Sequence, residues 1–383
     1  MRGLCGIDID KDKIYFSFAR QKGSAAVFLD ELSVNFSSNG KTFLEILQAN
    51  ASLINQKMSE KEKTFSFTVE KFFLNLPWEI CKTATFSATV PFANRKKITQ
   101  NDINLAKKYL QDTYLDWDDF CIHNLILNYE IEGNNYNKPP YGVLAKKIKI
   151  TSILVWFKDK LRKDIEDVFD NLEKGFGGMA YSPVSAIATV FESVNTINES
   201  CIVIDVGYDK TLAIALKNKK ILSIKDSNFG LRQLLEEVGK KFLLPEKLAQ
   251  EVFNRYISFK ELAYSKEVSI KNDESYINLS IQAANSFVKD YIKTAVNQIV
   301  ESLSGTLNSD FTIYFSGRLN EKEGFCDFSK QILSHPVVVP SAVKTASKSF
   351  GVLNYGISKF FDNEQIEKKS FLNRIMNIYK EYF

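Results

Sequence analysis

An apolar run that ends in an aspartate, followed by a turn and a second β-rich run, occurs twice in this chain. The first occurrence covers residues 6–19 and the second covers residues 201–216, about 200 residues further on. Each is expected to form a β-hairpin, because β-branched and apolar residues flank a polar turn. A third apolar run, residues 311–315, ends in Ser316-Gly317-Arg318. Related hairpins so far apart predict a duplicated, two-lobed α/β chain with a cleft between the lobes.

Segments with helical periodicity separate these strands. Apolar residues recur at helical spacing in residues 99–113, 158–176, 230–242, 245–256 and 283–303. Residues 134–141 contain the pair Pro139-Pro140 and are expected to form a loop. The alternation of strands and helices indicates an α/β protein throughout.

Composition and charge exclude several classes of protein. The 383 residues are 45% hydrophobic and 25% charged, as in an ordinary globular protein. The 50 basic and 46 acidic residues are spread along the chain, which argues against a nucleic-acid partner. The five cysteines form no CxxC pair, and the two histidines lie near no nucleophile motif. We therefore expect no zinc site, no disulfide framework and no hydrolytic triad. No apolar h-region follows Met1, so a cytoplasmic location is expected.

The last fourteen residues separate into two faces when they are wound as a helix. The apolar residues fall within an arc of about 160° at roughly 100° per residue. These residues are Phe371, Leu372, Ile375, Met376, Ile378, Tyr379, Tyr382 and Phe383. The preceding residues, 362–369, are too poor in apolar side chains to bury themselves and are expected to form a linker.

Two roles fit a helix at 370–383. It could fold back on the core of its own chain, as most amphipathic helices do. Alternatively, it could lie in a membrane interface with cationic residues near anionic headgroups, and Arg374 and Lys380 would contribute to that binding. At fourteen residues it is too short to span a bilayer.

The motifs resemble those of the actin-like ATPase superfamily and, within it, of the bacterial cell-division protein family FtsA. Residues 6–9 followed by Lys13 resemble the first phosphate hairpin of the superfamily. Residues 205–207 followed by Thr211 resemble the second hairpin, and Ser316-Gly317 resembles the start of the adenosine-binding turn. The likeness to FtsA lies in residues 98–103 and 139–148, which resemble signatures of its inserted subdomain. Lys138 and Ala145 depart from that pattern.

The resemblance implies a two-lobed actin-like ATPase fold with an FtsA-type inserted subdomain and a C-terminal amphipathic helix. The first lobe would comprise residues 1–89 and 179–199, with a closing helix at 348–361. The insert would cover 90–178. The second lobe would cover 200–347, with a helical subdomain at about 226–285. The linker at 362–369 and the membrane-targeting helix at 370–383 would complete the chain.

Glycine is missing where the superfamily places its phosphates. Asp10-Lys11 replaces Gly-Thr or Gly-Ser in the first turn, and Tyr208-Asp209-Lys210 replaces Gly-Gly-Thr in the second. Gly317-Arg318 stands where Gly-Gly is expected. An aspartate adds a side chain and a negative charge that would repel phosphate, whereas Lys11 or Lys210 could restore positive charge. These losses predict weak nucleotide binding and weak or absent hydrolysis.

The cofactor that the resemblance implies is ATP with Mg²⁺. Asp8 and Asp205 would hold the metal through water, and Lys13 and Thr211 would contact phosphate. The full set of candidate nucleotide-binding residues is Asp8, Asp10, Lys11, Lys13, Asp205, Gly207, Thr211, Gly230, Glu251, Arg255 and Gly317. No catalytic residue is expected.

The resemblance also implies a function. An FtsA-like protein would polymerise, bind other division proteins and tether the tubulin-like protein FtsZ to the inner face of the cytoplasmic membrane at the division site. One alternative is a PilM-like adaptor of type IV pilus assembly that binds a cytoplasmic peptide, although PilM-like chains lack the terminal amphipathic helix. A sugar-kinase-like phosphotransferase is a second alternative, but it would need intact phosphate loops.

Overall fold

The structure is a computed structural model that describes residues 2–22, 25–36, 41–170, 172, 174–193, 199–260, 267–272, 275–307, 310–339 and 347–361. The chain divides into two compact units. Unit 1 holds residues 1–9, 13–188 and 348–383, and unit 2 holds residues 10–12 and 189–347. The expected linker and terminal helix, residues 362–383, lie outside the described residues. None of the described helices is long and apolar enough to cross a membrane.

The first hairpin starts the main sheet of unit 1. β1 (Arg2–Ile9) pairs antiparallel with β2 (Lys13–Lys22), which confirms the hairpin predicted at 6–19. β3 (Ala25–Asn35) pairs with β2, while β4 (Thr68–Leu76) and β9 (Gly175–Tyr181) add two parallel strands beyond β1. The resulting order is β3-β2-β1-β4-β9.

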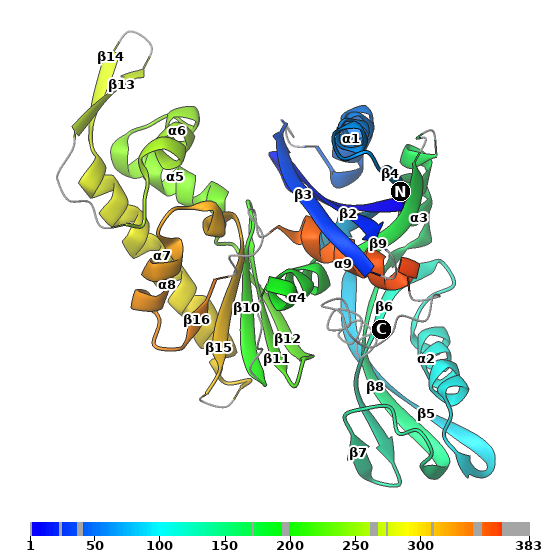
Figure 1. The fold of residues 1–383 in the computed structure, drawn as a ribbon. Coiled ribbons are helices and arrows are strands. Elements are labelled where there is room, and N and C mark those ends of the chain that lie inside the picture. Colours follow the sequence, from blue (N-terminus) through cyan, green and yellow to red (C-terminus); the bar gives the residue numbers. More distant parts are fainter. Residues whose placement is uncertain are drawn as a thin grey trace. The chain divides into compact units, whose positions relative to one another are not determined.

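Helices cover both faces of this sheet, because successive side chains of a strand point to opposite sides. Cys5 and Ile7 belong to a buried cluster with α1 (Phe43–Phe65) and α3 (Asp159–Phe169). On the other face, α9 (Lys348–Phe361) lies against the blue strands of Figure 1. A Cβ at Gly6 would overlap the carbonyl oxygen of Ser349 in α9. This glycine therefore permits close packing between a helix and the sheet.

The inserted segment of unit 1 builds a sheet of its own. A short turn of 3-10 helix at Trp78–Ile80 precedes it in the sequence. The order of strands in this sheet is β5 (Lys82–Lys97), β8 (Leu144–Lys158), β6 (Asp119–Ile131) and β7 (Asn134–Tyr136). One helix, α2 (Gln100–Tyr114), packs on this sheet through Ile103, Ala106 and Leu110. Strands β5 and β8 extend away from the main sheet of unit 1 in Figure 1, and α2 lies beside them.

Two sequence expectations in this region were wrong. The loop expected at 134–141 contains strand β7, which pairs with β6. The helix expected at 158–176 ends at Phe169, and Gly175 already belongs to β9. Phe176 packs on Phe72 and Phe169, so tertiary burial rather than helical periodicity explains the apolar residues at the end of this segment.

The main sheet of unit 2 repeats the strand order and directions of unit 1. β10 (Ser200–Val206), β11 (Thr211–Lys217) and β12 (Lys220–Ser227) are antiparallel, which confirms the second predicted hairpin. β15 (Thr312–Gly317) and β16 (Val337–Val338) continue the sheet in parallel beyond β10. The predicted duplication is therefore present in the topology of the two sheets.

Helices and a small hairpin complete unit 2. The buried core joins its sheet to α5 (Leu231–Phe242), α6 (Glu246–Tyr256), α7 (Ile281–Ser304) and α8 (Phe325–Ile332). The remaining elements are α4 (Ser182–Ser193), which crosses the division between the units, the hairpin of β13 (Glu267–Asn272) and β14 (Ser275–Ser280), and the short helix η2 (Arg318–Glu321). Sequence periodicity did not predict the β13–β14 hairpin.

Candidate functional site

The two candidate metal carboxylates occupy equivalent places in the two sheets. Asp8 lies near the end of β1 and accepts a hydrogen bond of 2.8 Å from Asn75 Nδ2 on the parallel neighbour β4. Asp205 lies near the end of β10 and accepts one of 2.7 Å from the Ser316 hydroxyl on the parallel neighbour β15. Both aspartates are buried. Each therefore joins two parallel strands at the edge where the turns begin.

The backbone donors around the second turn are taken by the chain itself. Gly230 is the N-cap of α5, and the first N–H groups of a helix are the ones that can bind phosphate. Here the Leu231 N–H donates to the Gly207 carbonyl at 3.2 Å, and the Arg232 N–H donates to the Tyr208 carbonyl at 2.8 Å. The Gly207 N–H donates to the Lys210 carbonyl at 2.9 Å. Carbonyl oxygens of the turn thus accept the hydrogen bonds that an anion could accept at this helix N-terminus.

The side chains expected to contact phosphate have other surroundings. Thr211 is fully buried, and its hydroxyl has no hydrogen-bond partner among the described residues. A phosphate could reach it only if the turn opened. Lys210 Nζ lies 3.0 Å from Asp226, and Lys13 Nζ lies 5.9 Å from the centre of the Tyr15 ring.

Asp209 in the second turn is an ion-pair acceptor. Lys11 Nζ lies 3.8 Å from Asp209 Oδ2, and Arg232 Nε lies 2.8 Å from Asp209 Oδ1. Arg232 also contacts Glu236 at 2.7 Å. Hydrogen bonds to Asp209 and Glu236 raise the pKa of Arg232 above its usual value. Lys11 and Lys210 were the two lysines expected to restore positive charge near phosphate. Each of them lies beside a carboxylate of the chain.

The third turn contains a buried arginine. Gly317 has φ of 88°, and a Cβ there would overlap the Val206 carbonyl, so the position requires glycine. Arg318 follows it and is 6% exposed. Its Nε donates to Asp10 Oδ2 at 2.9 Å, and its Nη2 donates to Asp12 Oδ1. Residues 10–12 belong to unit 2, so these bonds lie within one unit.

Tyr208 completes the surroundings of this arginine. The Arg318 guanidinium lies 5.5 Å from the centre of the Tyr208 ring, which is a cation–π contact. Burial raises the pKa of the Tyr208 hydroxyl, and the neighbouring Asp12 carboxylate raises it further.

The two candidate residues on α6 pair with each other. Arg255 Nη1 lies 2.8 Å from Glu251 Oε1, one helical turn away. The Arg255 side chain is 67% exposed and that of Glu251 is 38% exposed, so a surface ion pair accounts for both.

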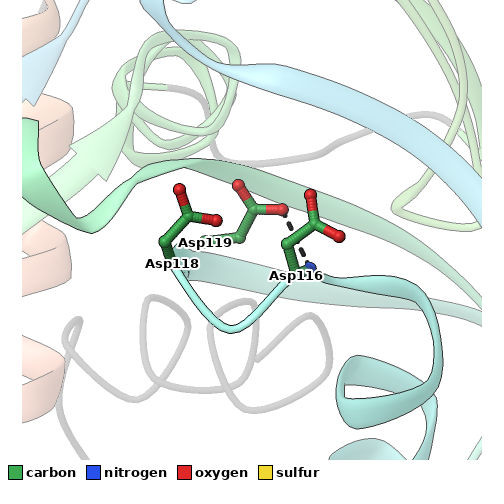
Figure 2. A group of neighbouring side chains, drawn as sticks. All are labelled: Asp116, Asp118 and Asp119. Carbon is green, nitrogen blue, oxygen red and sulfur yellow. Dashed lines mark hydrogen bonds between the residues drawn. The ribbon is translucent and has the colours of Figure 1, made fainter.

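An acidic cluster in unit 1 already contains a cationic side chain. Figure 2 shows Asp116, Asp118 and Asp119 with their carboxylates close together, as in a metal site. Lys158 Nζ lies 2.9 Å from Asp118 Oδ1, 2.9 Å from Asp119 Oδ1 and 3.5 Å from Asp116 Oδ2. Hydrogen bonds to Asp118 and Asp119 raise the pKa of Lys158. The ammonium group of Lys158 thus lies among these carboxylates and offsets part of their negative charge.

The described residues do not fit a magnesium-bound nucleotide in their present arrangement. The carbonyls of Gly207 and Tyr208 accept from two N–H groups at the start of α5, those of Leu231 and Arg232, and Arg318 pairs with the carboxylates of the first turn. Phosphate would have to displace these bonds. Sequence reasoning identified Asp10, Lys11 and Gly317 but missed Asp12, Tyr208 and Arg318. The sequence did contain one signal for Arg318, because an arginine stands directly after Gly317 where the superfamily has a second glycine.

Comparison with known proteins identifies the fold. No protein-family model matches the sequence. No curated protein matches it. Among solved structures, a chain of the PilM–PilN type IV pilus biogenesis complex matches with a TM-score of 0.61 and 12% identity, over 92% of this chain and 98% of the other. The chain has the actin-like ATPase fold.

Other actin-like structures match with lower scores. MreB5 of Spiroplasma citri, bound to ADP, has a TM-score of 0.51 and 10% identity, covering 96% of this chain and 99% of its own. The MamK double helical filament has a TM-score of 0.51 and 9% identity, covering 93% of this chain and 98% of its own. This fold therefore occurs in proteins that bind nucleotide, form filaments or assemble with pilus proteins.

Proposed function

We propose that this chain is an FtsA-like membrane adaptor that tethers FtsZ to the cytoplasmic face of the cell membrane at the division site. It acts as a scaffold that self-associates and binds other division proteins, with weak or absent ATP hydrolysis. The observation that carries the proposal is the complete separation of apolar and polar residues at 370–383, after a polar linker. The signatures at 98–103 and 139–148 support the FtsA assignment.

The inserted subdomain offers a surface for protein partners. Leu105 and Tyr109 lie one helical turn apart on α2. Leu105 is 55% exposed and Tyr109 is 48% exposed. Trp117, beyond the end of the helix, is 98% exposed. Tyrosine and tryptophan are enriched at binding hot spots, and contiguous exposed apolar patches mark interaction sites. We call Leu105 and Tyr109 the α2 face and assign it to contacts between copies of this chain.

The first test measures membrane binding. Phe371→Asp combined with Ile375→Asp places charges on the apolar face and should abolish co-sedimentation of the full chain with anionic liposomes. Asn373→Asp combined with Asn377→Asp adds the same charge to the polar face, so it is the matched control. The control should lose less binding, because it leaves the apolar face intact. Equal sedimentation of the double variant Phe371→Asp/Ile375→Asp and the wild type would contradict the proposal.

A PilM-like adaptor of type IV pilus assembly is the second candidate. The likeness to the PilM–PilN complex, at a TM-score of 0.61, supports it. Titration of the full chain with FtsZ and, separately, with a cytoplasmic peptide of the pilus partner distinguishes the two. Binding of FtsZ together with tail-dependent liposome binding supports the first candidate. Binding of the peptide alone, without liposome binding, supports the second.

A further inference from the structure

Arg318 is a buried charged group of unit 2. Its side chain is 5% exposed, and the side chains of Asp10 and Asp12 are 18% and 23% exposed. Moving a charge out of water is costly unless an opposite charge and hydrogen bonds replace the water. The guanidinium meets two carboxylates through two different nitrogens, Nε and Nη2, and one aromatic ring. This arrangement satisfies a buried arginine.

The contacts of Lys11 extend this pairing to the second turn. Lys11 lies between Asp10 and Asp12 in sequence and points to Asp209, whose other oxygen meets Arg232 at the start of α5. Turns 10–12, 207–210 and 317–318 are therefore connected by alternating positive and negative side chains. The backbone bonds from Leu231 and Arg232 to the second turn add two uncharged links.

We propose that Arg318 is the resident cation of these three turns and that it takes the place of a magnesium-bound nucleotide. The actin-like fold implies such a ligand, but a phosphate entering here would meet the carboxylates of Asp10, Asp12 and Asp209. Displacing Arg318 to make room would leave Asp10 and Asp12 without their buried partner. The turns are thus held by the chain's own ion pairs, and this arrangement does not depend on nucleotide. The inference is independent of the proposed membrane function.

The test compares thermal unfolding of the full chain and four variants: Arg318→Met, Asp10→Asn/Asp12→Asn, the combination of the two, and Arg255→Met. Arg318→Met keeps most of the side-chain volume and removes the charge, so the unfolding midpoint should fall by several degrees. Asp10→Asn combined with Asp12→Asn should restore part of this loss when it is added to Arg318→Met, because the two negative charges that faced the guanidinium are then removed as well. Arg255→Met breaks the exposed pair with Glu251 in the same unit and is the matched control; its midpoint should hardly change.

The response of the unfolding midpoint to divalent cations is a second readout, and a loss of packing alone would produce no such response. Mg²⁺ or Ca²⁺ should raise the midpoint of Arg318→Met, because the carboxylates of Asp10 and Asp12 can offer oxygen ligands to a hard cation once the guanidinium is removed. The same ions should leave the wild type unchanged. A strictly additive effect of the Arg318 and aspartate substitutions, with no response to divalent cations, would show that Arg318 acts through packing and would overturn the proposal.

Calorimetric titration of the wild type with Mg-ATP is decisive without any variant. No heat of binding and no shift of the unfolding midpoint are expected at millimolar nucleotide. Saturable binding, or a midpoint that rises with nucleotide concentration, would show that Arg318 yields to the ligand and would overturn the proposal even if Arg318→Met failed to fold.

Discussion

Two glycines illustrate how one residue type can serve different purposes in one fold. Gly6 belongs to a sequence resembling a phosphate hairpin, but its missing side chain makes room for the Ser349 carbonyl of α9. Gly317 instead has a backbone conformation, φ of 88°, that other residues rarely adopt, and it lies against the Val206 carbonyl. Gly6 therefore serves packing, whereas Gly317 serves the conformation of its turn as well as close packing, each within its own unit.

We predict that Gly317→Ala destabilises the chain markedly. Backbone strain at positive φ costs about 1–3 kcal/mol, and the overlap with Val206 adds to it. Denaturant unfolding should show the loss. Gly305→Ala is the control, because its φ is −68° and no atom lies within 4 Å of a Cβ placed there. That variant should be neutral or more stable by about 0.4–1 kcal/mol. Equal losses in the two variants would contradict the role assigned to Gly317.

At the scale of elements, α2 shows how local sequence defines a helix terminus. Its capping box is complete: the Thr99 hydroxyl accepts from the Asp102 N–H, and the Asp102 carboxylate accepts from the Thr99 N–H at 3.0 Å. Lys96 Nζ lies 2.5 Å from the same carboxylate. Burial alone would raise the pKa of Asp102, but the bonds from Lys96 and Thr99 outweigh it and lower this pKa.

We predict that Asp102→Asn lowers stability by about 1 kcal/mol at neutral pH, because it weakens the cap and removes the Lys96 pair. The folded-state pKa of Asp102 is depressed, so its stabilisation is present above the unfolded-state pKa of about 3.9. It is lost as the pH falls through the folded-state pKa. Urea unfolding across this range should show the wild type and the variant converging in acid.

The control for this pH effect is Asp112→Asn on the same helix. Asp112 is exposed, so the change should stay within about 0.5 kcal/mol at every pH. A difference between Asp102→Asn and wild type that persists at low pH would mean that the carboxylate charge is not what stabilises α2.

At the scale of the whole molecule, membrane binding and self-association are expected to depend on each other. Eight apolar side chains of the tail gain about 1 kcal/mol each on partial insertion. Fixing the backbone of fourteen residues in a helix costs about 1 kcal/mol each, which is a larger but comparable total. Cationic residues add about 1 kcal/mol apiece on an anionic surface. The free energy of membrane binding by one helix at 370–383 is therefore close to zero. Several such helices linked in one assembly bind more tightly through avidity.

We predict that Leu105→Ser combined with Tyr109→Ser weakens self-association and, through avidity, liposome binding at low protein concentration. Both side chains are exposed, so folding should be unaffected. Sedimentation velocity and liposome co-sedimentation over a concentration series measure the two effects. Leu243→Ser, at a leucine that is 84% exposed in unit 2, is the control. Unchanged binding and assembly in the Leu105/Tyr109 variant would remove the α2 face from the proposed interface.

Local patterns in the sequence were sufficient for much of the fold. The two hairpins, the helices α2, α5, α6 and α7 and the duplicated arrangement follow from periodicity, caps and turn residues, which act over a few neighbouring positions. Where apolar runs were short, periodicity failed: it extended α3 into β9 and missed β7 and the β13–β14 hairpin. Short apolar runs fit a strand or a helix equally well, and only burial decides between them.

The candidate site depended on tertiary structure. The sequence alone placed aspartates and lysines at three turns and showed that glycines were missing there. It could not show that Arg318 pairs with Asp10, 308 residues earlier, or that the carbonyls of Gly207 and Tyr208 satisfy the start of α5. A charged side chain has many possible partners along a chain of 383 residues. The partner it takes is decided by which turns the fold of unit 2 brings together, because ion pairs and hydrogen bonds act only over a few ångströms.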